Sequence, residues 1–170
     1  MLECLILYSL LDRDLTTYKI RKSIIDSFEI FSKPSLGAIH PALIKLAEKK
    51  CVETAKIMSD GGQKSMFHHI TNEGRKKFYQ MFSSINSTMI PKISVEIKIK
   101  IAMLPAIANV EAKQKFLENA QKALELAGYD IRNSMEKNTC GFYQTSASLM
   151  YKDIAGLTST VEKLRKEGLE

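Results

Sequence analysis

The chain has 170 residues, of which 45% are hydrophobic and 26% charged, and its formal net charge is +6. This length indicates one domain, or a small domain with a helical extension, and the composition excludes wholesale disorder. No apolar stretch approaches the roughly 20 residues that a membrane span needs, and the first residues lack the basic start of a signal peptide. The three cysteines, Cys4, Cys51 and Cys140, are far apart and typical of a reducing compartment. We therefore expect a soluble, cytoplasmic protein.

Positive charge is concentrated in residues 33–77. This segment holds nine Lys and Arg residues against four Asp and Glu residues, an excess of five, so the rest of the chain carries an excess of only one. A local excess of this kind is compatible with a polyanionic partner such as nucleic acid, although net charge alone does not identify one.

Three helices are expected in the first 50 residues. Residues 2–11 are apolar on nearly every side, as in a short buried helix. Thr16 or Thr17 can cap a second helix, and Ser35 can cap a third. Because Pro41 lacks a backbone N–H, the third helix either begins at Pro41 or bends near its N-terminus.

A β-hairpin is expected next. Val52–Met58 and residues 65–70 are rich in β-formers, and an Asp-Gly-Gly turn at 60–62 joins them. Thr71 can cap a fourth helix. The order helix, helix, helix, hairpin, with positive charge around its second half, is typical of a winged helix-turn-helix.

Residues 91–105 are open to two interpretations. Ile93, Val95, Ile97, Ile99 and Ile101 alternate with polar residues, and this periodicity favours a strand. At helical spacing the same residues form two apolar faces, as in a helix that packs against neighbours on two sides at a dimer interface. The periodicity alone favours the strand, and the helix needs independent support.

Two heptad helices are expected after residue 109. Asn109 can cap the first, and Gly128 is expected to interrupt or end it. A loop at 138–141 reverses the chain, so the two helices should pack antiparallel. Each helix alone leaves its seam exposed, which predicts a homodimer built mainly by residues 91–167. The seam residues are Val110, Leu117, Ala120, Leu124, Ala127 and Ile131 in the first helix, and Tyr143, Ala147, Met150, Ile154, Leu157, Val161 and Leu164 in the second.

Three motifs resemble those of one known family. Residues 34–46, PSLGAIHPALIKL, closely resemble the PadR signature P-S-x-G-T-I-Y-P-A-L-x-x-L. At matching distances, residues 17–20 (TYKI) are similar to the family's G-Y-E-I, and residues 70–75 (ITNEGR) to its L-T-x-x-G-R. The resemblance covers residues 2–82. It implies a prokaryotic transcription regulator: a dimeric winged-helix protein, often a repressor, with C-terminal dimerisation helices and a variable effector. It also favours the helix over the strand at 91–105.

Four positions depart from the family pattern. Ala38 replaces the usual Thr, His40 the usual Tyr, Lys50 the usual Gly, and His68 the usual Tyr of the wing. Ala38 and His40 lie on the DNA-facing end of the third helix, so the DNA sequence read by this chain is expected to differ from that of its relatives.

The expected DNA-binding residues lie on the second and third helices and the hairpin. The N-terminal end of the third helix can enter a major groove, where His40 is expected to donate to a base or phosphate; a merely solvent-facing side chain is the alternative. Tyr18 matches a family position at the DNA backbone, with packing beneath the third helix as its alternative. Lys64 at the wing tip is expected to reach phosphate or the adjacent minor groove, and a solvated turn lysine is its alternative. Lys45 is similar. The full set is Tyr18, Ser35, Gly37, Ala38, His40, Pro41, Lys45 and Lys64.

Other chemistries have little support in the sequence. His68 and His69 are adjacent, and adjacent strand residues point to opposite faces, so they do not easily share a metal ion. No H-x-x-x-H, C-x-x-C, glycine-rich phosphate loop or G-x-S-x-G pattern is present. We therefore expect no metal, no cofactor and no enzymatic activity.

The sequence predicts a mainly α fold with a small β-hairpin wing. A winged helix-turn-helix DNA-binding domain is expected at residues 1–84, and a helical, antiparallel, coiled-coil-like dimerisation and effector region at 85–170. The favoured function is a PadR-type regulator that binds double-stranded operator DNA as a homodimeric repressor. An unidentified effector, with a small molecule as the candidate, is expected to release it. The alternative is a winged-helix module that binds a protein through its heptad helices and does not bind DNA.

Overall fold

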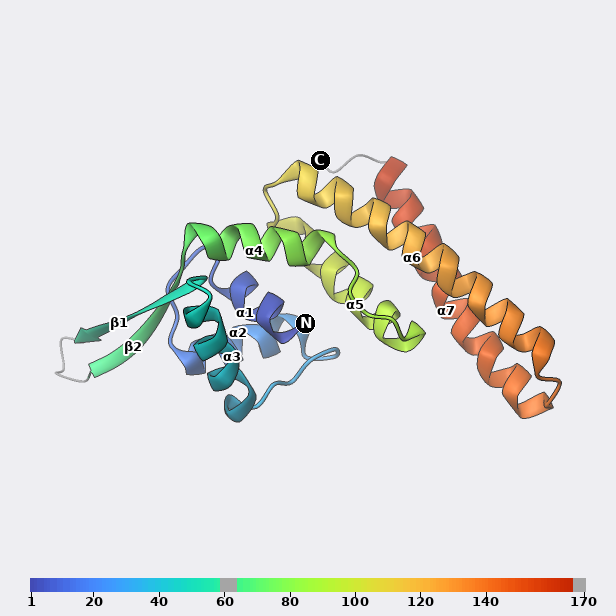
Figure 1. Cartoon of the computed structure of the whole chain (residues 1–170), viewed down its shortest axis with the longest axis horizontal. Helices are drawn as coiled ribbons and strands as arrows, with labels where there is room; N and C mark the ends of the chain where they lie inside the picture. Colours follow the sequence, from blue (N-terminus) through green and yellow to red (C-terminus); the bar gives the residue numbers. More distant parts are fainter. Residues whose placement is uncertain (59–63, 167–170) are drawn as a thin grey trace. The chain divides into compact units, whose positions relative to one another are not determined.

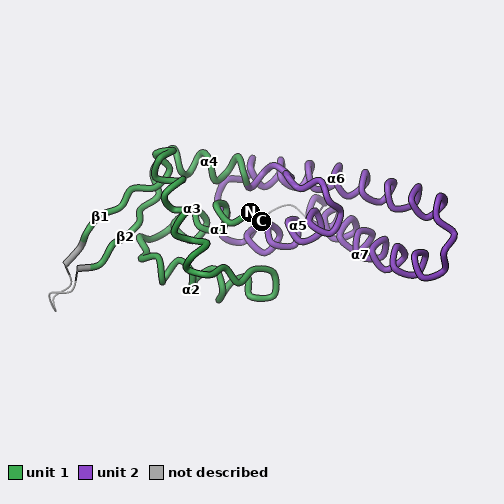
Figure 2. The backbone as a smooth tube through the Cα atoms, turned by 60° about the horizontal axis from the view of Figure 1, so that its bottom comes forward, with its two compact units in different colours: residues 1–81 green, residues 82–170 purple. Residues whose placement is uncertain are grey.

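The computed structural model describes residues 1–58 and 64–166. The chain divides into two compact units, residues 1–81 and 82–170, which Figure 2 distinguishes by colour. Helices predominate in both, and one two-stranded antiparallel sheet lies in the first unit (Figure 1). The prediction of a mainly α protein with a small hairpin is confirmed. No described helix is both long and apolar enough to cross a membrane.

The first unit has the order expected of a winged helix. Three of its helices begin at side chains that were predicted to cap them, because Thr16, Ser35 and Thr71 each accept a hydrogen bond from a backbone N–H three residues later. The elements are α1 (Leu2–Ser9), α2 (Thr17–Phe28), α3 (Leu36–Glu48), β1 (Val52–Met58), β2 (Lys64–Ile70) and α4 (Asn72–Ser83).

The core of the first unit follows the apolar periodicity of its helices. α1 is buried along most of its length, and the Tyr8 ring meets the Phe28 ring edge-on at 5.5 Å between centroids. α2 and α3 each bury one stripe of three apolar side chains, so their opposite faces remain open. The buried stripes are Ile20, Ile24 and Phe28 on α2, and Ile39, Leu43 and Leu46 on α3.

The hairpin pairs β1 with β2 from Val52 opposite Ile70 to Met58 opposite Lys64. A short bridge adds Leu15, whose backbone exchanges two hydrogen bonds with His68. The sheet is thereby fastened to the segment that leads into α2. The turn at 60–62 that the sequence predicted lies outside the described residues.

Two residues of α3 and its C-terminal turn have unusual backbone positions, Pro41 inside the helix and Lys50 just after it. The helix begins at Leu36, five residues before Pro41, so of the two alternatives considered for Pro41 the start at Pro41 is wrong. At its C-terminal end, Lys50 has a φ of 56°, the left-handed conformation that glycine adopts most readily. The N–H groups of Lys50 and Cys51 return to the carbonyls of Ala47 and Leu46 and close the helix.

The second unit is a set of three α-helices. α5 (Ile90–Met103) is followed by a short 3-10 turn (Leu104–Ala106), and then by the long helices α6 (Val110–Lys137) and α7 (Gly141–Lys166). α6 begins at the predicted cap, since Asn109 Oδ1 accepts from the Ala112 N–H at 2.8 Å. α5 packs on both α6 and α7.

The strand interpretation of residues 91–105 is wrong, because α5 is a helix that buries two apolar faces. Ile93 and Ile97 lie on one face, and Ile99 and Met103 on the other. Glu96 and Lys100, which lie between these apolar residues in the sequence, are also buried. They can be buried because they form an ion pair with each other. Helical spacing of four residues brings Glu96 and Lys100 together, which makes an alternating sequence compatible with a helix.

Glu96 and Lys100 form a buried ion pair on α5. Lys100 is 1% exposed, and its Nζ lies 2.7 Å from Glu96 Oε1 and 2.5 Å from the Ser84 carbonyl. The Glu96 carboxylate also accepts from the N–H groups of Asn86 and Ser87 and from the Ser87 hydroxyl. Burial raises the pKa of Glu96, but these donors and the Lys100 charge outweigh burial and lower its pKa overall.

α6 and α7 form the predicted antiparallel hairpin and lie side by side along most of their lengths (Figures 1 and 2). Most of the α6 seam is buried, but Val110 is exposed and lies off it. In α7 only the second half of the seam, from Ile154 to Val161, is buried. The prediction that Gly128 interrupts the first helix is wrong: α6 continues unbroken to Lys137.

Candidate nucleic-acid interface

The outward face of α3 carries most of the residues that the sequence singled out. The stripe of Ile39, Leu43 and Leu46 is buried, which turns the remainder of the helix to solvent. The Ser35 hydroxyl caps the helix by accepting from the Ala38 N–H at 3.2 Å. The predicted residues that are exposed on α3 or at its cap are Ser35, Gly37, Ala38, His40, Pro41 and Lys45.

Pro41 changes the hydrogen-bonding of this face. In an α-helix the N–H of residue 41 would donate to the carbonyl of residue 37, and proline has no N–H to give. The Gly37 carbonyl therefore lacks its intrahelical donor. Since Gly37 and Pro41 are both exposed, this carbonyl adds an acceptor beside the positive end of the helix dipole.

α2 supplies Tyr18 and a side chain that supports the start of α3. Tyr18 is 62% exposed, so its ring is not packed beneath α3. One turn along, Arg21 Nε donates to the Pro34 carbonyl at 3.1 Å. Arg21 thereby fixes the turn that ends at the Ser35 cap. The sequence analysis did not identify Arg21, because a side chain bonding to a distant backbone carbonyl leaves no local pattern.

The described part of the wing ends near Lys64. Lys64 is the first residue of β2 and pairs with Met58, the last residue of β1. Its side chain lies outside the described part of the chain. Its expected role at phosphate therefore rests on its place in the sequence and in the hairpin register.

Two adjacent histidines at the base of the wing point to opposite faces, as the strand alternation predicts. His68 is 8% exposed; its Nε2 lies 3.0 Å from the Thr17 hydroxyl and its Nδ1 3.0 Å from the Thr54 hydroxyl. His69 is exposed, and its Nδ1 lies 2.8 Å from Asp14 Oδ1. Burial lowers the pKa of His68, and nearby His40 acts in the same direction, so the His68 ring is neutral at neutral pH.

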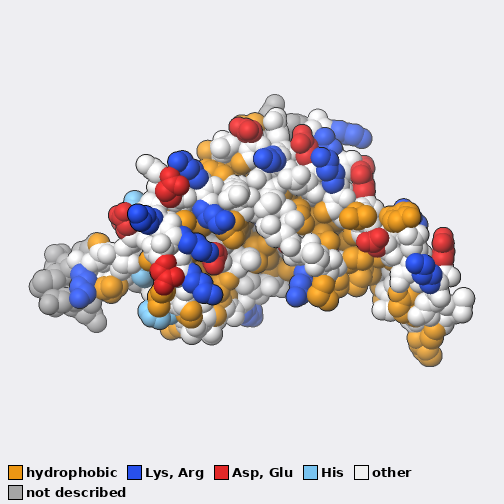
Figure 3. Space-filling model, in the orientation of Figure 1, with side chains coloured by type: hydrophobic (Ala, Val, Ile, Leu, Met, Phe, Trp, Pro, Cys, Tyr) orange, Lys and Arg blue, Asp and Glu red, His pale blue; other side chains and the backbone are white. Residues whose placement is uncertain are grey.

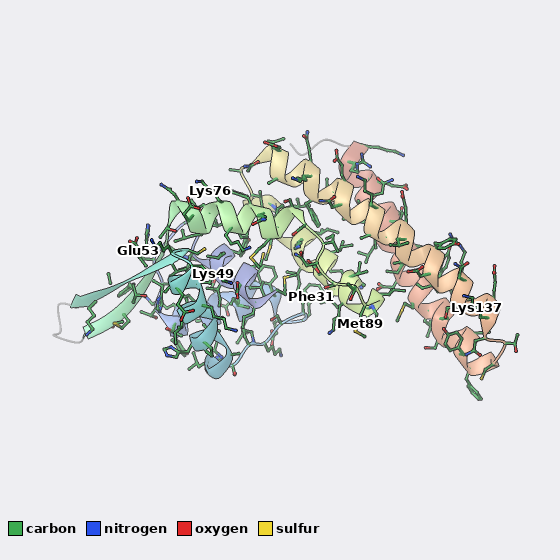
Figure 4. The ribbon with its side chains drawn as sticks, viewed as in Figure 1. Phe31, Lys49, Glu53, Lys76, Met89 and Lys137 are labelled. Atoms are coloured by element: carbon green, nitrogen blue, oxygen red, sulfur yellow. The ribbon has the colours of Figure 1, made fainter. Side chains whose placement is uncertain are left out.

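The basic residues of the first unit differ in how they are paired. Lys33, Lys49 and Lys76 each form an exposed ion pair, with Glu29, Glu3 and Glu73 respectively; Lys49 and Lys76 are labelled in Figure 4. Such exposed pairs are weak, about 0–1 kcal/mol, and a phosphate can displace the acid.

Other basic residues have no such partner. Within residues 1–58 and 64–166, Lys45, Lys50 and Lys56 have no acidic partner. Figure 3 shows Lys and Arg interspersed with acids over the visible face of this unit, and histidine side chains around the base of the wing.

No group of three His, Cys, Asp or Glu side chains that could hold a metal ion occurs within the described ranges. Cys4 and Cys51 are buried, and Cys140 is exposed in the loop before α7; all three are free thiols. Phe78, Phe82 and Met103 are buried core residues, whereas Met89 is exposed.

The comparison with protein families decides the assignment of the first unit. The model of the transcriptional regulator PadR-like family matches residues 6–80. Residues 6–80 are therefore similar to the PadR-like family. This range holds all eight predicted DNA-binding residues, from Tyr18 on α2 to Lys64 at the start of β2.

Solved structures similar to this chain include PadR and PadR-like regulators. A PadR-like regulator from Bacillus cereus is 26% identical, with 46% of this chain and 75% of that chain covered and a TM-score of 0.41. Bacillus subtilis PadR in complex with operator DNA is 15% identical, with 99% of each chain covered and a TM-score of 0.47. The same protein with p-coumaric acid gives 15% identity, coverage of 95% and 92%, and a TM-score of 0.41. No curated protein matches the chain.

The structure gives the PadR-like motifs of this chain a physical basis. In residues 70–75, Thr71 caps α4, a Cβ on Gly74 would lie 2.0 Å from the Cys51 carbonyl oxygen, and Arg75 donates to the Leu11 carbonyl at 2.7 Å. Of the departures from the PadR signature, Lys50 occupies a left-handed position suited to the usual glycine, and His68 is buried at the base of the wing.

Proposed function

We propose that this chain is a sequence-specific, DNA-binding transcriptional regulator that acts as a homodimer. In this proposal it is a repressor, not an enzyme, and an effector releases it from double-stranded operator DNA. The observation that carries the proposal is the exposed N-terminal face of α3 within a PadR-like match. α3 presents a capped helix end, small side chains that allow close approach, and His40.

The proposed contacts fall into two groups. Ser35, Gly37, Ala38, His40 and Pro41 lie at the groove-facing end of α3, where His40 is assigned a base edge. Tyr18, Lys45 and Lys64 are assigned to the DNA backbone, where side chains fix position without reading sequence. The proposed homodimer would present two copies of α3 to a site with two-fold symmetry.

His40→Ala and Lys64→Ala test this division. His40→Ala is expected to weaken the cognate duplex more than a scrambled one, by about 1–3 kcal/mol if the contact is well formed. Lys64→Ala is expected to weaken both duplexes about equally and to lower the slope of log affinity against log salt by roughly one. Fluorescence-anisotropy titrations on both duplexes at two salt concentrations measure these effects.

Thermal melts serve as the control, since both positions are at the expected surface and folding should survive. An equal loss on both duplexes for His40→Ala would assign His40 to the backbone. A chain that binds no DNA but captures a protein through α6 and α7 would instead be the interaction module considered above.

A further inference from the structure

The buried ring of His68 joins two elements of the proposed DNA interface. Thr17, the first residue of α2, adjoins Tyr18, and Thr54 lies in β1 of the wing. Both hydroxyls lie 3.0 Å from a ring nitrogen of His68, one from each nitrogen. The imidazole therefore bridges the start of α2 and the first strand of the wing.

The backbone contacts of the same residue provide only part of this link. The two hydrogen bonds between Leu15 and His68 fasten β2, and through its pairing also β1, to the segment before α2, but they do not reach Thr17. A neutral imidazole has one donor and one acceptor nitrogen, which matches two hydroxyls that each donate or accept. The bridge therefore depends on matching hydrogen-bond donors and acceptors, and not on charge.

We propose that His68 is a positioning residue, which holds the wing against the start of α2 so that the wing and Tyr18 meet the DNA backbone together. This inference rests on the proposed function, because it assigns a role within that interface. It predicts that a side chain with one donor and one acceptor can replace His68, and that an apolar one cannot.

Glutamine and leucine make this distinction. His68→Gln offers an amide N–H and a carbonyl oxygen and cannot become charged, whereas His68→Leu fills space without hydrogen bonding. His69→Ala is the matched control: it removes the neighbouring exposed pair with Asp14, which fastens the same segment from the opposite face.

The test is a fluorescence-anisotropy titration of the full chain on cognate and scrambled duplexes, at a temperature where melts show every variant folded. We expect His68→Leu to weaken both duplexes at least fivefold, while His68→Gln and His69→Ala stay within twofold of the unaltered chain. If His68→Leu binds like the unaltered chain, or if His68→Gln loses as much as His68→Leu, the inference is overturned.

Thr54→Val provides a second measurement that does not disturb the buried ring itself. It removes one hydroxyl from the bridge with little change of shape, and we expect a loss of affinity that is not additive with His68→Leu. Additive losses would overturn the bridge. Failure of the proposed function is a different result, because the unaltered chain would then bind no DNA at all.

Discussion

At the scale of single residues, Gly74 has the least room for a side chain among the glycines that the structure describes. A Cβ there would lie 2.0 Å from the Cys51 carbonyl oxygen and 2.8 Å from Ile70 Cγ1. Because a backbone group must move to relieve this overlap, we expect Gly74→Ala to lower the free energy of unfolding by about 1–3 kcal/mol. Urea unfolding followed by circular dichroism measures the loss.

Gly156→Ala is the matched control. It lies in α7, and a Cβ there would meet nothing within 4 Å. Alanine is the better helix former, so this change should stabilise by roughly 0.5–1 kcal/mol. Equal effects of the two substitutions would contradict the packing described around Gly74.

The Glu96–Lys100 pair gives a second prediction at this scale. Glu96→Gln leaves the buried Lys100 charge without its carboxylate, and breaking a buried pair in this way typically costs about 3–5 kcal/mol. Glu136→Gln on the exposed surface of α6 should change the free energy of unfolding by less than about 0.5 kcal/mol. The two variants are compared by urea unfolding at pH 7.

The pH dependence of this difference has a definite sign. The pKa of Glu96 is lowered from its usual 4.5 in the folded chain, so its contribution is present above that pH and is lost as the pH falls through the folded-state pKa. The gap between the unaltered chain and Glu96→Gln should therefore shrink below pH 4.5. A gap that stays constant down to acid unfolding would show that Glu96 is not ionised in the folded chain.

Residues whose role is local could be predicted from the sequence, and residues whose role is tertiary could not. Ser35, Thr71 and Asn109 each bond to a backbone N–H three residues away, so cap chemistry alone identifies them. The burial of His68 depends on Thr17 and Thr54, which are distant in the chain. The alternation along the strand predicted that His68 and His69 point to opposite faces, but it did not predict which side chains His68 contacts.

At the scale of elements, α5 shows where periodicity misleads. Its alternating Ile and Val residues predict a strand, but Glu96 and Lys100 satisfy each other at helical spacing inside the structure. The α6–α7 hairpin was predictable because its heptad spacing extends over many residues. Gly128 was expected to stop α6, but the surrounding helix continues through it, since one glycine costs only about 1 kcal/mol.

The helices of the second unit are expected to provide the homodimer. α6 and α7 cover part of each other's seam, yet large apolar side chains remain exposed on both, namely Leu126 and Tyr129 on α6 and Phe142 and Leu149 on α7. We expect the full chain to be a dimer by light scattering at micromolar concentration, and a chain ending at Phe82 to be a monomer. A full-length monomer, or a dimer of the shortened chain, would contradict this prediction.

At the scale of the whole molecule, a PadR-like unit is followed by a helical unit that is expected to pair two copies of the chain. Two copies of α3 would then read half-sites about one helical turn apart, related by two-fold symmetry. Six of the nine Lys and Arg residues within residues 33–77 lie on α3, the hairpin and α4. Phosphate contacts from this region would make binding depend strongly on salt, because each contact releases condensed counterions.

The most direct test of the account is the affinity of the full chain for DNA from the region upstream of its own gene, measured by fluorescence anisotropy at 50 and 200 mM salt. If each half makes several phosphate contacts, we expect saturable binding to a two-fold site that weakens on the order of a thousandfold between these concentrations. Binding that does not change with salt, or no binding to any genomic fragment offered, would contradict the central claim that this chain is a DNA-binding regulator.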